Sequence, residues 1–352
     1  MMNIKDIFKI GVEKKASDIH LMVGLKPKIR IDGVLTSVKD VEELTNKNLE
    51  EMIFSIINEE QKKTFLEKND LDFSLALETK DRFRINIHFE KGNFGLVARI
   101  IKEHLPTLED IDIPPIISNL LNMSQGLILV TGPTGCGKST TLAAMMNYIN
   151  DNRNCHIVTL EDPIEFLFKS SKSIVSQRQL GSDMPTFSSG LKHILRQDPD
   201  VVMVGEMRDL ETISATITLA ETGHLVLATL HTYSAAQTVD RIIDIFPPHQ
   251  QDQIRMQLSM TLAAVISQRL LPGIEGGRVA AREIMFNTPA IANLIRENKI
   301  AQIKTVLETN AKEGMVSLDQ DLKRLYREKK ISKEVAQNQM ANPEMLEKFR
   351  IL

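Results

Sequence analysis

The chain has 352 residues, enough for two ordinary globular domains with separate cores. Apolar residues make up 42% of it and charged residues 25%, a composition that excludes a disordered or fibrous chain. The 43 Lys and Arg against 46 Asp and Glu give a net charge of -3, so no global basic field favours nucleic-acid binding. No apolar run approaches the ~20 residues of a membrane span, and the first residues lack a signal peptide's apolar core. We therefore expect a cytoplasmic protein that reaches a membrane only through partners.

Short strand and helix patterns fill the first third of the chain. Alternating apolar residues predict strands at 28–35, with a turn at Asp32-Gly33, and at 81–89 and 95–100. Apolar periodicity predicts one helix over residues 49–65. Three prolines between residues 104 and 115 predict a linker.

Beyond the linker, four apolar runs predict buried parallel strands at 127–130, 157–160, 201–204 and 225–230. Helical patterns lie between these runs, which is typical of a doubly wound α/β core. The tail from Thr288 onward is helical in pattern. We predict an N-terminal domain over 1–103, a linker over 104–115, an α/β ATPase core over 116–287 and a helical C-terminal region over 288–352.

A glycine-rich loop follows the first of these apolar runs and precedes a helical stretch. It fits the pattern G-x-x-x-x-G-K-[ST], whose backbone N–H groups and helix N-terminus bind phosphates. Lys138 would reach the β/γ phosphates of ATP, and the Ser139 hydroxyl would bind Mg²⁺. The candidate nucleotide-binding residues of the loop are Gly132, Pro133, Thr134, Gly135, Cys136, Gly137, Lys138, Ser139 and Thr140.

Ionisable residues follow the other three runs, at the edge where ligands bind open parallel sheets. Glu161 and Glu165 follow the second run, and either could hold Mg²⁺ through water or shape its surroundings. Glu206 ends the third run, where a carboxylate could orient and deprotonate the attacking water. His231 ends the fourth. A lone acid after a strand is as often a helix cap, and Asp209 fits that interpretation.

Three further residues, one histidine and two arginines, each allow either a structural or a functional interpretation. His224 begins the run that His231 ends, so it is either a subunit-contact residue or a core residue. Arg84 and Arg99 lie on adjacent predicted strands of the first domain. They are either ordinary surface arginines or arginine fingers that deliver positive charge to a neighbouring nucleotide.

Four ordered motifs of this chain resemble those of the type IV pilus retraction ATPases (the PilT/PilU family) in the type II/IV secretion ATPase superfamily. Residues 131–140 match the Walker A loop, 156–166 resemble the family's Asp box, 198–209 its Walker B and 221–232 its His box. Residues 16–20 are similar to the opening of its N-terminal PAS-like domain. The resemblance covers nearly the whole chain.

The resemblance implies a RecA-like P-loop core with a smaller PAS-like α+β domain and a helical extension. It implies a homohexameric motor at the cytoplasmic face of the bacterial inner membrane, which hydrolyses ATP to ADP and phosphate and acts on an inner-membrane platform protein. Other pilus ATPase paralogues are further possible partners; nucleic acid is not. It also implies Glu206 as catalytic base, Glu165 as a required Asp-box carboxylate and His224 and His231 as His-box residues, while Arg84 and Arg99 match arginines that reach the nucleotide across a subunit boundary.

The chain departs from the family pattern at two positions. Ala292 replaces an arginine of the retraction signature AIRNLIRE, and residues 257–272 are closer to the PilU version, so the paralogue stays open. Cys136 replaces the usual loop serine, which suggests sensitivity to thiol reagents. The alternatives are a pilus-extension or type II secretion ATPase, a nucleic-acid translocase and a scaffold that does not hydrolyse ATP. Two cysteines cannot supply the four-cysteine zinc site of the first alternative.

Overall fold

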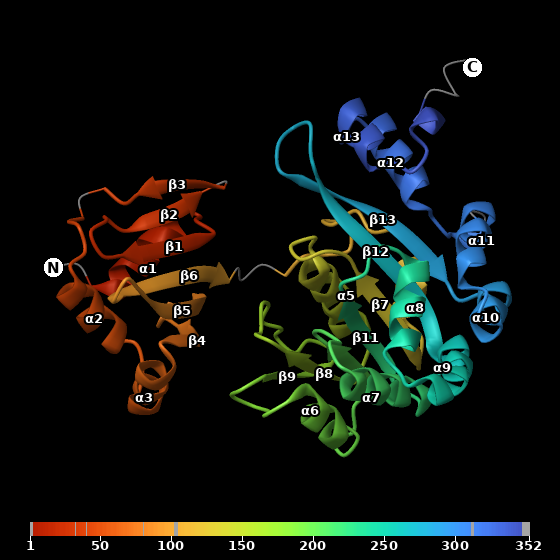
Figure 1. The fold of residues 1–352 in the computed structure, drawn as a ribbon, viewed down its shortest axis with the longest axis horizontal. Coiled ribbons are helices and arrows are strands. Elements are labelled where there is room, and N and C mark those ends of the chain that lie inside the picture. The colour runs from red at the N-terminus through yellow and green to blue at the C-terminus, as the bar shows by residue number, and fades with distance from the viewer. Residues whose placement is uncertain are drawn as a thin grey trace. The chain divides into compact units, whose positions relative to one another are not determined.

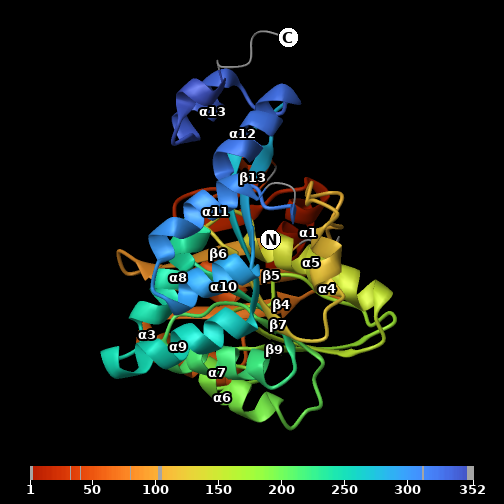
Figure 2. The same cartoon turned by 90° about the vertical axis from the view of Figure 1, so that its right-hand side faces the viewer.

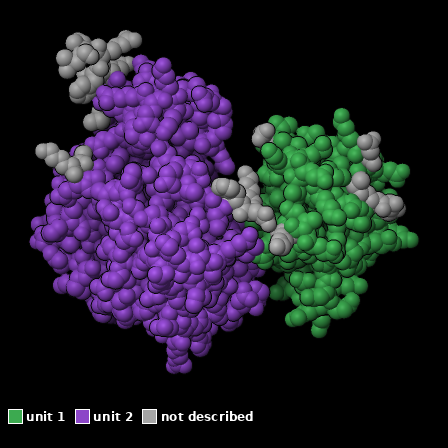
Figure 3. All heavy atoms as spheres, turned by 180° about the vertical axis from the view of Figure 1, so that it is seen from behind, with its two compact units in different colours: residues 1–104 green, residues 105–352 purple. Residues whose placement is uncertain are grey.

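The computed structural model describes residues 3–31, 33–39, 41–79, 81–101, 105–310 and 313–346. The chain divides into two compact units, Met1–His104 and Leu105–Leu352, which Figure 3 shows in different colours. Asp32, in the predicted hairpin turn, and His104, at the start of the predicted linker, lie outside the described residues. Within those residues no helix combines the length and apolar character needed to cross a bilayer.

The first unit is a six-stranded antiparallel sheet with three helices (Figure 1). Its strand order is β3-β2-β1-β6-β5-β4. Its core includes Phe8 and Phe83, whose rings stack with centroids 4.6 Å apart. The elements are α1 (Ile4–Glu13), β1 (Asp18–Met22), β2 (Lys28–Ile31), β3 (Val34–Ser37), α2 (Asn46–Phe54), α3 (Glu59–Lys68), β4 (Asp70–Ala76), β5 (Arg82–Glu90) and β6 (Asn93–Ile101).

The single helix predicted over residues 49–65 is wrong, because the structure has two helices, α2 and α3, in this region. Asn58 begins the second helix with a capping box: its side chain accepts from the Gln61 N–H, and the Gln61 side chain accepts from the Asn58 N–H. This reciprocal pair stabilises a new helix start, and the apolar periodicity runs across the break.

The second unit contains a seven-stranded sheet in the order β13-β12-β7-β11-β10-β8-β9. The four predicted parallel strands are confirmed as β7 (Gly126–Thr131), β8 (His156–Glu161), β10 (Val201–Val204) and β11 (Leu225–Leu230). The sequence did not predict β9 (Ile174–Gln179), β12 (Leu262–Pro272) or β13 (Arg278–Phe286). β12 runs parallel to β7, and β13 pairs antiparallel with β12 at the edge.

Helices cover both faces of this sheet, as Figures 1 and 2 show. One face packs on α4 (Ile117–Leu121) and α5 (Lys138–Asn152), through residues such as Met145 and Ile149. The other face packs on six helices, of which the last two belong to the predicted C-terminal region: α6 (Phe187–Ile194), α7 (Leu210–Glu221), α8 (Ala235–Asp244), α9 (Pro248–Thr261), α10 (Pro289–Arg296) and α11 (Ile303–Thr309). The α/β class expected from the alternating pattern is therefore confirmed.

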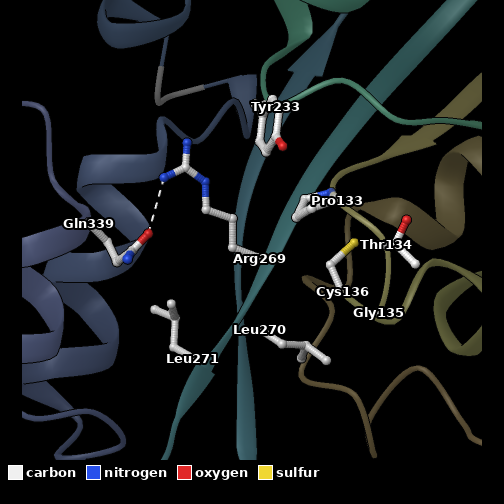
Figure 4. A pocket seen from close by; sticks show the side chains of 9 residues that line it. All are labelled: Pro133, Thr134, Gly135, Cys136, Tyr233, Arg269, Leu270, Leu271 and Gln339. Atoms are coloured by element: carbon white, nitrogen blue, oxygen red, sulfur yellow. Dashed lines mark hydrogen bonds between the residues drawn. The ribbon is translucent and has the colours of Figure 1, made fainter.

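The C-terminal segment ends in α12 (Leu318–Arg327), α13 (Lys333–Gln339) and the 3₁₀ turn η3 (Pro343–Leu346), with a 3₁₀ turn η1 (Ile300–Gln302) before α11. A separate apolar cluster packs α12 and α13 against the β12–β13 hairpin and includes Leu271, Ala281 and Leu325. This cluster brings α12 and α13 beside the hairpin that borders the glycine-rich loop (Figure 4).

Candidate nucleotide-binding site

The glycine-rich loop connects β7 to α5. Gly132, Gly135 and Gly137 have φ angles of 144°, 78° and 89°, which only glycine adopts without strain. A Cβ atom on Gly132 would also lie 2.3 Å from the backbone oxygen of Gln268. The tight curl of the loop therefore requires glycine, and Thr134 and Gly135 are exposed at its tip.

Lys138 points back into the loop. Its Nζ donates to the carbonyl oxygens of Gly132 (2.9 Å) and Pro133 (3.1 Å) and lies 3.4 Å from Nδ1 of His231. Burial lowers the pKa of Lys138, and the negative charges of Glu206 and Glu165 are among the influences that oppose this shift. Both carboxylates therefore act electrostatically on the ammonium.

Glu206 and His231 meet at this edge of the sheet, as their positions after β10 and β11 predict. Nε2 of His231 lies 2.8 Å from Oε1 of Glu206, and a guanidinium nitrogen of Arg208 lies 2.8 Å from Oε2. An ammonium can only donate, so Nδ1 of His231 accepts from Lys138 and Nε2 carries the proton towards Glu206. A continuous chain of polar contacts therefore joins the phosphate loop to Glu206.

The pKa of Glu206 lies below its usual value. Burial alone would raise this pKa, but the hydrogen bonds from Arg208 and His231 and the charge of Arg208 outweigh burial. The carboxyl group is consequently ionised at neutral pH and able to accept a proton.

The two glutamates that follow β8 differ in exposure. Glu165 is exposed, whereas Glu161 is buried and its Oε1 accepts from Thr159 (2.7 Å) and from Gln177 (2.9 Å). Burial raises the pKa of Glu161. These contacts favour the second of its two interpretations, in which Glu161 shapes the surroundings of the site.

His224 lies at the opposite end of β11 from His231. Its Nδ1 lies 3.0 Å from the carbonyl oxygen of Leu219, in the last turn of α7, and 3.3 Å from the Thr222 hydroxyl. Within one chain the structure does not bring His224 to the phosphate loop.

Gln268 of β12 holds the phosphate loop from behind, a role that the sequence did not reveal. The side chain is 2% exposed; its Nε2 donates to the Cys136 carbonyl (2.8 Å), and its Oε1 accepts from the Thr141 hydroxyl (2.9 Å). The preceding residue, Ser267, shares a 2.7 Å hydroxyl hydrogen bond with Thr131. The loop and the start of α5 are therefore fixed by two neighbouring residues of β12.

Cys136 is buried, and burial raises the pKa of its thiol. The thiolate is the reactive form, so both features argue against the sensitivity to thiol reagents suggested by the sequence. The backbone of Cys136 serves the loop through its carbonyl oxygen.

Oxygen donors at the loop fit a magnesium ion held jointly with substrate phosphates. Ser139 is exposed in the first turn of α5. Glu165 is also exposed, and its negative charge acts on Lys138 of the loop. In the described ranges no group of three or more His, Cys, Asp or Glu side chains could hold a metal. Mg²⁺ commonly binds through few protein oxygens together with phosphates and water, which this arrangement permits.

Arg84 and Arg99 are directly opposite each other on β5 and β6 of the first unit. The Nε of Arg99 donates to Asp18 (2.9 Å), whose carboxylate also accepts from the Ser17 hydroxyl (2.8 Å). Burial alone would raise the pKa of Asp18, but its bonds to Ser17 and Arg99 hold it below the usual value. Asp18 therefore orients an arginine that remains 68% exposed, and sequence patterns alone gave Asp18 no such role.

The site has a strand, a glycine loop and a helix N-terminus that suit phosphates. It also has a carboxylate at the end of a nearby parallel strand. This combination defines a P-loop nucleoside triphosphatase. The family described as "Type II/IV secretion system protein" matches residues 2–347. The chain belongs to this family, and its fold is a RecA-like core with a PAS-like first unit and a helical C-terminal region.

Individual relatives are similar over nearly their full length. The chain is 45% identical to the type IV pilus retraction ATPase PilT of Pseudomonas aeruginosa, over 97% of this chain and 99% of the relative. It is 38% identical to the type IV pilus ATPase PilU of the same organism, over 95% of this chain and 88% of that one. A crystal structure of the pilus retraction motor PilT with bound ADP matches with a TM-score of 0.93 and 43% identity, covering 99% of this chain and all of that one (100%).

Replacing Gln268 by Ala tests its contact with the loop. The substitution leaves the Cys136 carbonyl and the Thr141 hydroxyl buried without this partner, at a cost of about 1–3 kcal/mol. We expect the KM for ATP to rise about tenfold while kcat changes less, as steady-state kinetics would measure. Gln253→Ala, on the exposed side of α9, is the matched control. An unchanged KM in a folded Gln268→Ala protein would show that the loop does not depend on Gln268.

Proposed function

We propose that this protein is a homohexameric ATPase motor that hydrolyses ATP to ADP and phosphate and drives type IV pilus retraction. It works in the cytoplasm at the inner face of the inner membrane, on a platform protein of the pilus machine. The chain is 45% identical to PilT over nearly its full length, which supports this assignment. Its identity to PilU is lower, at 38%, which favours the PilT type. The observation that carries the proposal is the contact chain Lys138–His231–Glu206.

Lys138 binds the β/γ phosphates of ATP. Its three donors now meet two loop carbonyls and His231, so these contacts are exchanged for phosphate oxygens when the nucleotide arrives. The N–H groups of the first turn of α5 and the loop backbone add further positive potential. When Lys138 moves to the phosphates, Nδ1 of His231 loses this hydrogen bond. The state of the imidazole therefore depends on whether the phosphates are bound.

Glu206 is the catalytic base that orients and deprotonates the attacking water. His231 and Arg208 each hold one of its oxygens, which fixes the plane of the carboxylate. An ionised carboxylate has about four lone-pair positions, so acceptor capacity for a water remains. Ser139 would hold Mg²⁺ together with the phosphates, with Glu165 as an outer carboxylate of the same site. The ion, when bound, would neutralise phosphate charge.

Arg84 and Arg99 complete the site of a neighbouring subunit in the ring. Their opposed positions place two cations on one sheet surface, and Asp18 keeps Arg99 in a defined orientation. Two adjacent positive charges suit the charge that develops on a transferring phosphoryl group. His224, at the far end of β11, is a subunit-contact residue in this proposal.

Replacing Glu206 by Gln removes the base and keeps the shape of the side chain. We expect ATP binding to persist and turnover to fall by about 10²–10⁴. Lys138→Ala, in contrast, abolishes nucleotide binding. Calorimetric binding and phosphate-release assays on the purified proteins measure both, with Glu211→Gln, an exposed glutamate in the first turn of α7, as control.

In the producing bacterium, the Glu206→Gln gene in place of the natural one gives cells with excess pili that do not twitch. Bald cells would mean that the motor extends pili instead. Full turnover by the purified Glu206→Gln protein would contradict the assigned base.

Mixed rings test the arginine pair. Arg84→Ala lowers turnover of the assembled ring because the neighbouring site loses a cation. Glu206→Gln subunits carry intact arginines, so adding them to Arg84→Ala subunits restores part of the activity. Lys91→Ala, a cation at the β5–β6 turn, is the control and leaves turnover unchanged. Absence of rescue at every mixing ratio would place the action of Arg84 within its own chain.

A further inference from the structure

The connection between β8 and β9, residues 162–173, carries Glu165 and has no helix or strand of its own. The two strands run parallel, with Glu161 opposite Gln179. A parallel crossover usually contains a helix, in which backbone groups bond to one another. The backbone N–H and C=O groups of this connection need other partners, and side chains of β8, β9 and α5 supply several of them.

Gln177 of β9 holds the first half of this connection. Its Nε2 donates to the carbonyl oxygen of Phe166 (2.8 Å), and its Oε1 accepts from the N–H of Phe168 (2.9 Å). The same Nε2 also donates to Oε1 of Glu161 (2.9 Å). Burial raises the pKa of Glu161, and a hydrogen bond from the backbone N–H of Glu165 is among the influences that oppose this shift. One carboxamide and one buried carboxylate therefore fix the backbone at Glu165 and directly after it.

Asn150, near the end of α5, holds the second half of the connection in the same manner. Its Nδ2 donates to the carbonyl oxygen of Lys169 (2.8 Å), and its Oδ1 accepts from the N–H of Ser171 (3.0 Å). The connection thus has two carboxamide anchors. Gln177 contacts the segment beside Glu165, whereas Asn150 contacts the segment that leads into β9.

We propose that Gln177 is a positioning residue of the nucleotide site, because it fixes the backbone at Glu165 and so aims that carboxylate towards the phosphate loop. The inference rests on the proposed function, in which Glu165 is an outer carboxylate of the site. Glu165 is exposed, and its charge acts on Lys138 of the loop. An exposed side chain on a loop has many orientations, and a fixed backbone reduces their number. Residues that orient such a group typically affect metal affinity or activity by about 10–100-fold.

Steady-state kinetics of Gln177→Ala test this assignment. We expect kcat to fall about tenfold or more, while the KM for ATP changes less than about twofold, because β12 holds the phosphate loop. Gln177→Met keeps the length of the side chain without its amide, and it gives the same split if the alanine variant fails to fold. Asn150→Ala is the matched control: it removes the other carboxamide anchor and leaves kcat unchanged.

A double-mutant cycle separates positioning from general damage. Glu165→Gln lowers kcat, and adding Gln177→Ala to it causes no further loss, because the effect of Gln177 passes through the carboxylate that is already absent. Two losses that multiply would mean that Gln177 acts independently of Glu165. That result, or an unchanged kcat in both Gln177 variants, would overturn the inference.

Hydrogen exchange gives a measurement that needs neither nucleotide nor turnover. In Gln177→Ala the amides of residues 164–168 exchange about tenfold faster, the scale of one lost hydrogen bond, while residues 169–173 keep their protection. Asn150→Ala shows the reverse pattern. Unchanged exchange at 164–168 in both Gln177 variants would contradict the inference. A natural protein that binds ATP but never hydrolyses it would instead overturn the proposed function, and the exchange result alone would then decide whether Gln177 fixes the segment of Glu165.

Discussion

Parallel pairing of β7, β10 and β11 is the constraint on which the site depends. The register aligns Leu230 with Thr131 and Val204 with Ala228, so these strands finish at one edge of the sheet. The next residues along the chain are the phosphate loop, Glu206 and His231. Residues almost a hundred positions apart therefore form one contact chain, with Lys138 and Glu206 each bonded to the same imidazole. A shift in the register of β10 or β11 relative to β7 would separate Glu206 from the phosphate loop.

Strand β12 adds a second set of constraints on the same loop. Three consecutive residues act in turn: Ser267 bonds to Thr131, Gln268 to the loop and α5, and Arg269 to α13. The strand is thus the physical connection between the phosphate site and the C-terminal helices. Its residues therefore contact both the phosphate loop and helix α13.

Sequence patterns predicted the parts of the fold whose signals are local. The glycine loop is fixed by backbone conformations that need glycine, and β7, β8, β10 and β11 are continuous apolar runs that only buried strands explain. Polar residues 267–269 interrupt the pattern of β12, so this strand and the role of Gln268 could not be predicted. The role of Gln268 depends on a contact with a residue more than a hundred positions away in the chain. The break between α2 and α3 was missed because the Asn58 cap lies within a continuing apolar period.

The most direct test of the central claim is a crystal structure of the ring with Mg²⁺, ADP and a fluoroaluminate mimic of the transferring phosphoryl group. The account predicts that Lys138 leaves the carbonyls of Gly132 and Pro133 for the mimic. It also predicts the Glu206 carboxylate within hydrogen-bond reach, about 2.6–3.2 Å, of the attacking water. A Glu206 side chain turned away from that water, with another group in its place, would contradict the account.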